Sequence, residues 1–289
     1  MGEPEKRIVD EPTDRIREVA RKALKGRMPL AIASGIIYML CLSIPVIIVE
    51  QITGLWDVLE RATNDYIDAM ANGSTPEMIY ELVQSYQGQW NISIATFLFL
   101  LLVPGPLTLG VNTVWLRVIR GHEAFADMVL SGFGNFFRAI LLHFFRSALM
   151  ALWAVFFIVP GIMTYYRYNL VFFLLADNPD MSPFTALNLS KYYMRGNRAG
   201  RFSLDMSFIG WFLLAAAVLF LANCIVIYIV ENTGAGSIIF TEQLVTSILF
   251  AIIFAPLGAY RGVSAADYYH RVICKAPDSF NDALKFSNT

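Results

Sequence analysis

Long blocks of apolar residues, separated by shorter polar and basic stretches, dominate the chain. The blocks long enough to cross a membrane as helices are Pro29–Val49, Ile92–Leu116, Ala139–Val159, Phe202–Val230 and Ile238–Gly258. A sixth block, Ile162–Ala176, would reach only about 22 Å as a helix, short of a hydrocarbon layer of about 30 Å. It follows Pro160-Gly161, where we expect the chain to turn. The pattern predicts an all-α, polytopic helical membrane bundle of about six membrane segments, one of them short.

Amphipathic stretches next to these blocks predict helices that lie on the membrane surface. In residues 1–28, apolar positions recur on one face of a helix, and a similar stretch lies near 124–137. A third stretch, near 183–195, is preceded by Ser182 as N-cap and followed by Gly196 as C-cap. We interpret these as three units, each an interfacial helix followed by a membrane hairpin. Common ancestry and repeated physical constraints both explain such a repeat.

Loop charges predict which side of the membrane each loop occupies, because cytoplasmic loops are rich in Lys and Arg. Basic residues mark 1–28, 117–138 and 177–201 as cytoplasmic, whereas residues 50–91 carry seven acids against one arginine. The predicted organisation is a cytoplasmic N-terminus 1–28, a first span 29–49, an extracytoplasmic acidic helical hairpin 50–91, a membrane bundle 92–270 and a cytoplasmic tail 271–289. The hairpin is either an acidic cap that gathers cations or basic peptides, or simply a solvated pair of helices.

Composition and motifs narrow the class of function. Hydrophobic residues make up 56% of the chain and charged residues 16%, which argues against a soluble protein. The net charge of −1 provides no general attraction for nucleic acid. His122-Glu123 is not followed by a second histidine at helical spacing, and no nucleophile elbow, phosphate-binding loop or metal-spaced cysteine pair occurs. We therefore expect no cofactor, no metal and no catalytic residue. No removable signal peptide is evident, so the first span is expected to remain as an anchor.

Charged residues inside apolar blocks are the strongest candidates for function, because they are costly in a bilayer. The candidates are Arg146, Arg167, Asp205, Glu242 and Arg261. We expect Asp205 to pair with Arg146, and Glu242 with Arg167, inside the bundle. The pairs would be structural, or they would line a transport or proton pathway.

Two other patterns indicate packing rather than chemistry. The four-residue spacing of Gly258, Gly262 and Ala266 predicts a surface that another helix approaches closely. Aromatic residues are predicted to face lipid or the membrane interface, namely Trp153, Tyr165, Tyr166, Tyr168 and the phenylalanines.

Residues 155–211 contain a distinctive run of motif positions. Its positions are Pro160-Gly161, Asp177-Asn178-Pro179, Ser190, Arg195-Gly196 and Ser207-Phe208-Ile209-Gly210-Trp211. This run resembles the DUF975 family of integral membrane proteins of unknown function. The resemblance implies a multi-pass protein of the bacterial inner membrane and no established activity. The family usually has a lysine where Arg198 or Ala199 stands here, and its C-terminal pattern is only loosely matched by Pro256 to Tyr260.

The central motif forms a predicted elbow between two hairpins on the cytoplasmic side. Asp177-Asn178-Pro179 is expected to end one helix, and Gly196 another, while Arg195, Arg198 and Arg201 meet lipid headgroups. The elbow either specifies the fold or forms a docking surface for anionic lipid or a protein partner.

These features favour a non-enzymatic membrane protein that binds lipid, a peptide or another membrane protein. A small transporter or channel that uses the intramembrane charges is the alternative, and a membrane enzyme comes third. A charge-paired core would favour binding, whereas a water-lined cavity containing the charges would favour transport.

Overall fold

The structure, a computed structural model, describes residues 8–53, 55–73, 75–85, 98–233 and 239–274, and all of the regular secondary structure in these ranges is helical. Within them, six stretches are long and apolar enough to cross a membrane: Met28–Val49, Leu98–Ile119, Ala126–Phe156, Ile158–Asp177, Arg198–Ile229 and Gln243–Ile273. The predicted all-α bundle with six membrane segments is confirmed.

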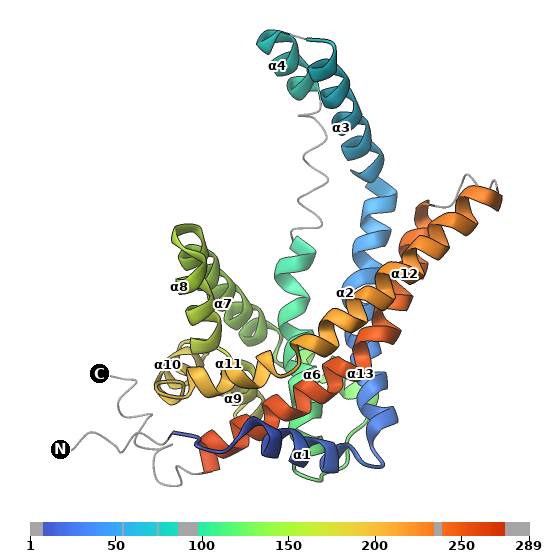
Figure 1. Cartoon of the computed structure of the whole chain (residues 1–289). Coiled ribbons are helices and arrows are strands. Elements are labelled where there is room, and N and C mark those ends of the chain that lie inside the picture. The colour runs from blue at the N-terminus through green and yellow to red at the C-terminus, as the bar shows by residue number, and fades with distance from the viewer. Residues whose placement is uncertain (1–7, 54, 74, 86–97, 234–238, 275–289) are drawn as a thin grey trace.

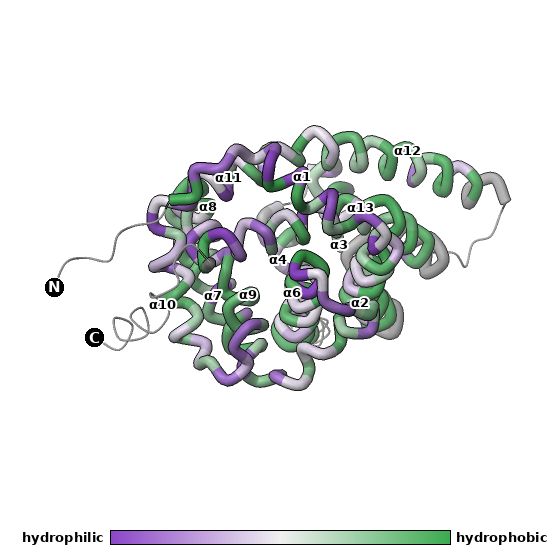
Figure 2. Tube along the Cα trace, turned by 90° about the horizontal axis from the view of Figure 1, so that it is seen from below, coloured by the Kyte–Doolittle hydropathy of each residue, from purple (hydrophilic) through white to green (hydrophobic). Residues whose placement is uncertain are grey.

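The long helices rise together from a layer of shorter ones (Figure 1). The rising helices are α2 (Met28–Thr53), α6 (Pro104–Ile119), α7 (Phe136–Phe156), α8 (Ile158–Arg167), α12 (Ile209–Thr233) and α13 (Ile239–Cys274). The layer of shorter helices, here called the base, contains α1 (Thr13–Leu24), α9 (Val171–Asp177), α10 (Pro183–Tyr193) and α11 (Arg198–Met206). Viewed from below, the base helices α1 and α11 carry many hydrophilic residues, whereas α12 is largely hydrophobic (Figure 2). The base is therefore the polar end of the membrane bundle.

The acidic segment after the first span forms two helices at the end opposite the base (Figure 1). They are α3 (Leu55–Ala71) and α4 (Pro76–Ser85), and Gly73, with φ of +69°, lies in the turn between them. A positive φ is readily adopted by glycine because it has no Cβ. The hairpin has the form expected from the sequence, and its extracytoplasmic location stays a prediction.

Helix α1 buries its apolar face on protein and not on lipid. Ile16, Ala20 and Leu24 are at most 4% exposed, and the helix packs against α13. The Arg17 guanidinium lies 5.2 Å from the centroid of the Phe208 ring, within the range of a cation–π contact. Helix α1 thus contacts both α13 and the start of α12, and it connects the two.

The turn between α7 and α8 lies three residues before the predicted break. Phe157 has the extended conformation that separates the helices, and Pro160 and Gly161 lie within the first turn of α8. Proline is tolerated there because the first N–H groups of a helix have no partner inside it. A Cβ on Gly161 would lie 3.0 Å from Ala154, so the missing side chain lets the two helices approach.

The span Ile158–Asp177, which follows the turn after α7, is here called the return segment. It is interrupted between α8 and α9. The Ser190 hydroxyl donates to the Arg167 carbonyl at 2.9 Å and accepts from the Leu170 N–H at 3.3 Å, which satisfies backbone groups at this interruption. Residues Val171–Leu175 of α9 are all buried. A short helix that is apolar on every side has to be surrounded by protein or lipid, and α9 packs against α6, α7 and α10. The interruption thus lets the return segment leave α8 and enter the protein core.

Helix α13 continues past Gly258, where the apolar block Ile238–Gly258 ends. It runs for 36 residues with Pro256 inside it, and it would span about 54 Å. Ala255, Ala259 and Val263 are fully buried on its inner face, so packing outweighs the hydrogen bond that the proline removes. The predicted close approach is present at Gly262, where a Cβ would lie 2.5 Å from the Trp115 indole nitrogen of α6.

A close backbone contact joins α6 to η2 (Ala126–Asn135), a 3₁₀ helix at the second predicted amphipathic stretch. A Cβ on Gly110 would lie 1.8 Å from the Val129 carbonyl oxygen, and one on Gly132 would lie 1.9 Å from the Pro106 carbonyl oxygen. Both obstacles are main-chain atoms, which cannot rotate away. Two glycines on facing elements therefore set the distance between α6 and η2.

The Gly132→Ala substitution is expected to destabilise the protein because its methyl group would force α6 and η2 apart. Overpacking of this kind costs about 1–3 kcal/mol. Gly134→Ala in the same 3₁₀ helix is the matched control, because nothing lies within 4 Å of its added Cβ. Thermal unfolding of the detergent-purified proteins should show a lower Tm for Gly132→Ala alone. Equal Tm values for the two variants would contradict the role assigned to this contact.

Candidate functional site

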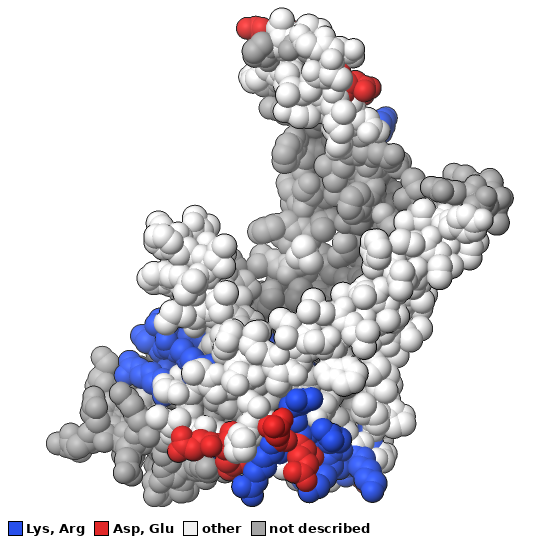
Figure 3. Space-filling view, viewed as in Figure 1, with Lys and Arg blue, Asp and Glu red and all other residues white. Residues whose placement is uncertain are grey.

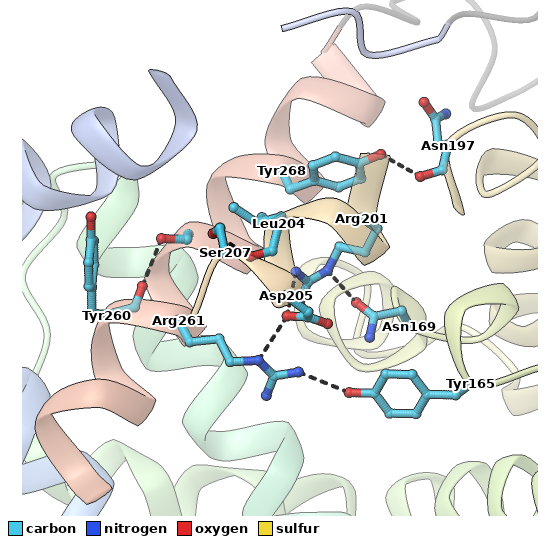
Figure 4. Close-up of polar contacts among 11 residues, drawn as sticks. Tyr165, Asn169, Asn197, Arg201, Leu204, Asp205, Ser207, Tyr260, Arg261 and Tyr268 are labelled. Carbon is cyan, nitrogen blue, oxygen red and sulfur yellow. Dashed lines mark hydrogen bonds and ion pairs between the residues drawn. The ribbon is translucent and has the colours of Figure 1, made fainter. Parts of the chain in front are cut away.

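The centre of the polar structure is the Asp205 carboxylate on α11 (Figure 4). One of its oxygens, Oδ1, accepts from Arg201 Nη1 at 3.0 Å and from Arg261 Nε at 2.8 Å. Arg201 precedes Asp205 by one helical turn, whereas Arg261 comes from α13. Asp205 and Arg201 are 8% and 2% exposed, so the charges are paired away from solvent. This cluster joins α11 to α13.

Each arginine extends the cluster toward the return segment (Figure 4). Arg201 Nε donates to the Asn169 side-chain oxygen at 2.9 Å, and Arg261 Nη2 donates to the Tyr165 hydroxyl at 3.1 Å. Tyr165 lies in α8 and Asn169 at the interruption that follows it. The resulting group of Tyr165, Asn169, Arg201, Asp205 and Arg261, here called the Asp205 cluster, connects three parts of the chain.

The predicted pairing of Asp205 with Arg146 is wrong. The guanidinium of Arg146, on α7, lies 5.4 Å from the Tyr165 ring centroid and 5.7 Å from that of Phe172. Asp205 instead pairs with an arginine on its own helix and one on α13, which the helical spacing and the packing of α13 bring closer. Arg146 therefore borders the Asp205 cluster through the Tyr165 ring without sharing the carboxylate.

The structure leaves the second predicted pair of intramembrane charges undetermined and corrects the prediction for two tyrosines. The side chain of Glu242 lies outside the described residues, so its predicted pairing with Arg167 stays a prediction. Tyr168 is 9% exposed, and Tyr165 contacts two arginines, which corrects the prediction that these tyrosines face lipid. The rings of both tyrosines pack inside the protein because the return segment enters the core after α8.

A second group of contacts fixes the elbow where α10 meets α11. Gly196 has a φ of +87°, so its left-handed conformation ends the turn after α10. The Tyr268 hydroxyl of α13 donates to the Asn197 carbonyl at 2.6 Å (Figure 4). The Asn197 side chain accepts from the Val9 N–H at 2.9 Å and donates to the Tyr193 carbonyl at 2.8 Å. The elbow is thereby attached to both α13 and the segment before α1.

Asp177 of the motif anchors the end of α9. Arg120 forms two hydrogen bonds with its carboxylate, at 2.6 and 2.7 Å, and the Tyr269 hydroxyl donates to it at 2.9 Å. A two-pronged arginine–carboxylate contact is strong and fixes geometry as well as charge. Helix α9 ends at Asp177 as predicted, Asn178 follows as its C-cap, and the Pro179 carbonyl accepts from Arg138 at 2.6 Å.

The last residues of the motif, 207–211, lie just before and at the start of α12. Phe208 is fully buried, and its ring meets the Tyr260 ring edge-on at 5.1 Å. The Ser207 hydroxyl donates to the Leu204 carbonyl at 2.7 Å. Gly210 has open space around it, and Trp211 is 57% exposed. Most of the motif thus positions helices, while Trp211 lies on the outer surface.

Three arginines in or next to the base have no ion-pair or hydrogen-bond partner for their side chains among the described residues. They are Arg167 at the end of α8, Arg195 just after α10 and Arg198 at the start of α11. Arg198 experiences electrostatic repulsion from the other two, which places the three charges together. None of their side chains forms an ion pair or hydrogen bond with any residue that the structure describes, and the Nε atoms of Arg167 and Arg198 are buried without a partner. Figure 3 shows basic side chains over this region, apart from the mixed charges of α1.

The predicted set Arg195, Arg198 and Arg201 is therefore corrected. Arg201 belongs to the Asp205 cluster, and Arg167 joins Arg195 and Arg198 as a cation that has no ion pair with any residue that the structure describes. The spacing of Arg201 and Asp205, one helical turn apart, could have indicated their pairing. The proximity of Arg167 to the elbow had no signal in the sequence, because it depends on how α8 packs against α11.

Comparison with known proteins places most of these residues in one family segment. Residues 156–276 match DUF975, described as "Protein of unknown function (DUF975)". The resemblance predicted from the sequence is confirmed over this segment. No curated protein and no solved structure matches the chain.

The DUF975 segment contains the whole Asp205 cluster and the three free arginines. Arg146, which borders the Asp205 cluster, and Arg120, which binds Asp177, come from the chain before the DUF975 segment. Among the described residues, no group of three or more His, Cys, Asp or Glu side chains could hold a metal ion. The chemistry available in this part of the chain is thus dominated by guanidinium groups and their counter-charges.

Asp205→Asn is expected to be strongly destabilising because it leaves Arg201 and Arg261 without their shared carboxylate. Breaking a buried ion pair in this way costs about 3–5 kcal/mol. Asp180→Asn is the matched control, since Asp180 is exposed and pairs only with Arg138 at 3.1 Å. The yield of monodisperse protein in detergent and its Tm measure the effect. Similar values for both variants would show that the Asp205 cluster does not hold the base together.

Proposed function

We propose that this chain is a non-enzymatic protein of the bacterial cytoplasmic membrane that binds anionic phospholipid at its base. The group of Arg167, Arg195 and Arg198, here called the arginine triad, is the observation that carries the proposal. The DUF975 match and the six candidate spans support a membrane protein of this family. Lys and Arg are concentrated on cytoplasmic sides of membranes, so we orient the base toward the cytoplasm.

The chemistry of the arginine triad suits a phosphate group. Guanidinium groups bind phosphate oxygens through two parallel hydrogen bonds, and they are more weakly hydrated than ammonium groups. Because the three charges repel one another, an anion placed among them would relieve that repulsion. The arginines of the triad lie at the end of α8, just after α10 and at the start of α11, where the base adjoins the rising helices (Figure 1). We expect lipid headgroups at such a boundary between polar and apolar helices.

A peptide or membrane-protein partner is the less favoured occupant of the same surface. An acidic peptide could also satisfy the arginine triad, but a headgroup is already present at high local concentration beside it. The Asp205 cluster uses two of the intramembrane cations and their carboxylate for structure. This pairing supports a binding role over the alternative of a small transporter or channel.

Combined replacement of Arg167, Arg195 and Arg198 by Gln is expected to remove a specifically retained anionic lipid. Each basic residue near an anionic leaflet contributes about 1 kcal/mol, so the loss corresponds to about a hundredfold in affinity. Native mass spectrometry of the full chain in neutral detergent, with phosphatidylglycerol added at known concentrations, measures this change directly.

The matched control replaces Arg15 and Lys22 of α1 and its C-cap residue Lys25 by Gln, which removes the same charge. Lys22 already pairs with Glu18 at 2.6 Å, and all three side chains are exposed. This control should keep the lipid. A wild-type chain that retains no phosphatidylglycerol, or equal loss in both variants, would contradict a specific site at the arginine triad.

A further inference from the structure

Arg146 is a cation whose neighbourhood contains no compensating acid. It lies ten residues after the start of α7 at Phe136, which corresponds to about 15 Å along the helix. The residues that interact electrostatically with the Arg146 guanidinium are Tyr165, Tyr38 and Arg261. Its Nε atom is buried without a hydrogen-bond partner, and the described residues accept no hydrogen bond from its other nitrogens. The charge is therefore held in place by aromatic rings alone.

The charge balance of the surrounding group is also positive. Arg201 and Arg261 share the single Asp205 carboxylate, and Arg146 adds a third cation to the same group. The Arg261 side chain is 34% exposed, so protein does not cover it completely. An uncompensated cation at this depth is costly, and it is stabilised only by water or by an anion.

Neighbouring hydroxyl groups complete a polar lining. The Tyr165 hydroxyl already accepts from Arg261, and its own proton is free to be donated. The Tyr38 hydroxyl of α2 lies 3.3 Å from the Thr108 hydroxyl of α6. Two guanidiniums and these hydroxyls supply donors, and the carboxylate of this group, Asp205, already accepts from Arg201 and Arg261.

We infer that Arg146 and Arg261 form a second anion site, inside the bundle, for an oxyanion such as a phosphate group. The site takes either the headgroup of an anionic lipid inserted between α7 and α13, or a free anion that enters from water. It shares no residue with the arginine triad and stands independently of the lipid-binding role proposed there.

The test uses the full chain in neutral detergent with two probes, inorganic phosphate and dioleoyl phosphatidylglycerol. Binding is measured as the rise in Tm with probe concentration at constant ionic strength. Loss of a charge-assisted hydrogen bond is worth about tenfold or more in affinity, so Arg146→Gln should weaken binding by at least that factor. Arg138→Gln, on the same helix and half-exposed, should bind as the wild type does.

Two further variants keep the result interpretable. Arg146→Lys retains the charge but loses the planar group, so it tests the site even if Arg146→Gln does not fold, and it should bind more weakly than the wild type. A chain lacking the arginine triad should still respond to the probe, which separates this site from the first. A response to phosphate identifies a free anion, and a response to the lipid alone identifies a headgroup. The inference is overturned if neither probe binds, if both Arg146 variants bind like the wild type, or if removal of the arginine triad abolishes all binding.

Discussion

A charge inside a hydrophobic bundle has to be neutralised, and the arrangement of the base follows from that constraint. Asp205 neutralises Arg201 on its own helix and Arg261 on α13, and those arginines hold Asn169 and Tyr165. The cost of leaving any of these groups without its partner ties the return segment, α11 and α13 to one another. The hydrophobic effect places helices in the membrane, but lipid is as apolar as the helices, so polar contacts and close packing have to specify how they associate.

Close packing supplies the rest of that specificity. Gly110 and Gly132 let α6 and η2 meet backbone to backbone, and Gly262 lets α13 meet Trp115. These contacts lie between elements that flank the polar cluster, so α6 and α13 arrive at fixed positions. The Arg120–Asp177 pair then joins α6 to the end of α9. Geometry and charge pairing therefore reinforce each other at the base, while the outer parts of α7 and α12 have many exposed apolar side chains suited to lipid.

The sequence predicts what depends on local pattern and misses what depends on tertiary packing. The six spans, the Ser182 cap of α10 and the turn at Gly196 were predictable because each follows from a run length or a single residue's conformational preference. The continuation of α13 through Pro256 and beyond the apolar block has no signal in the sequence, because the packing that keeps the helix intact involves other helices. Asp205 was correctly expected to be paired, and its spacing from Arg201 indicates one partner, but Arg261 could be chosen only by knowing that α13 lies beside α11.

The same residue type thus acquires two roles according to its neighbours. Arg201 lies only three residues after Arg198, yet it is buried against a carboxylate one helical turn away, whereas Arg198 faces other arginines. With carboxylates assigned to structural pairs, the remaining cations of this region are Arg146 and the arginine triad, at different depths of the bundle. An excess of guanidinium over carboxylate in a low-dielectric environment attracts anions whatever their source. Both proposed anion sites therefore rest on the counter-charge that the described residues do not provide.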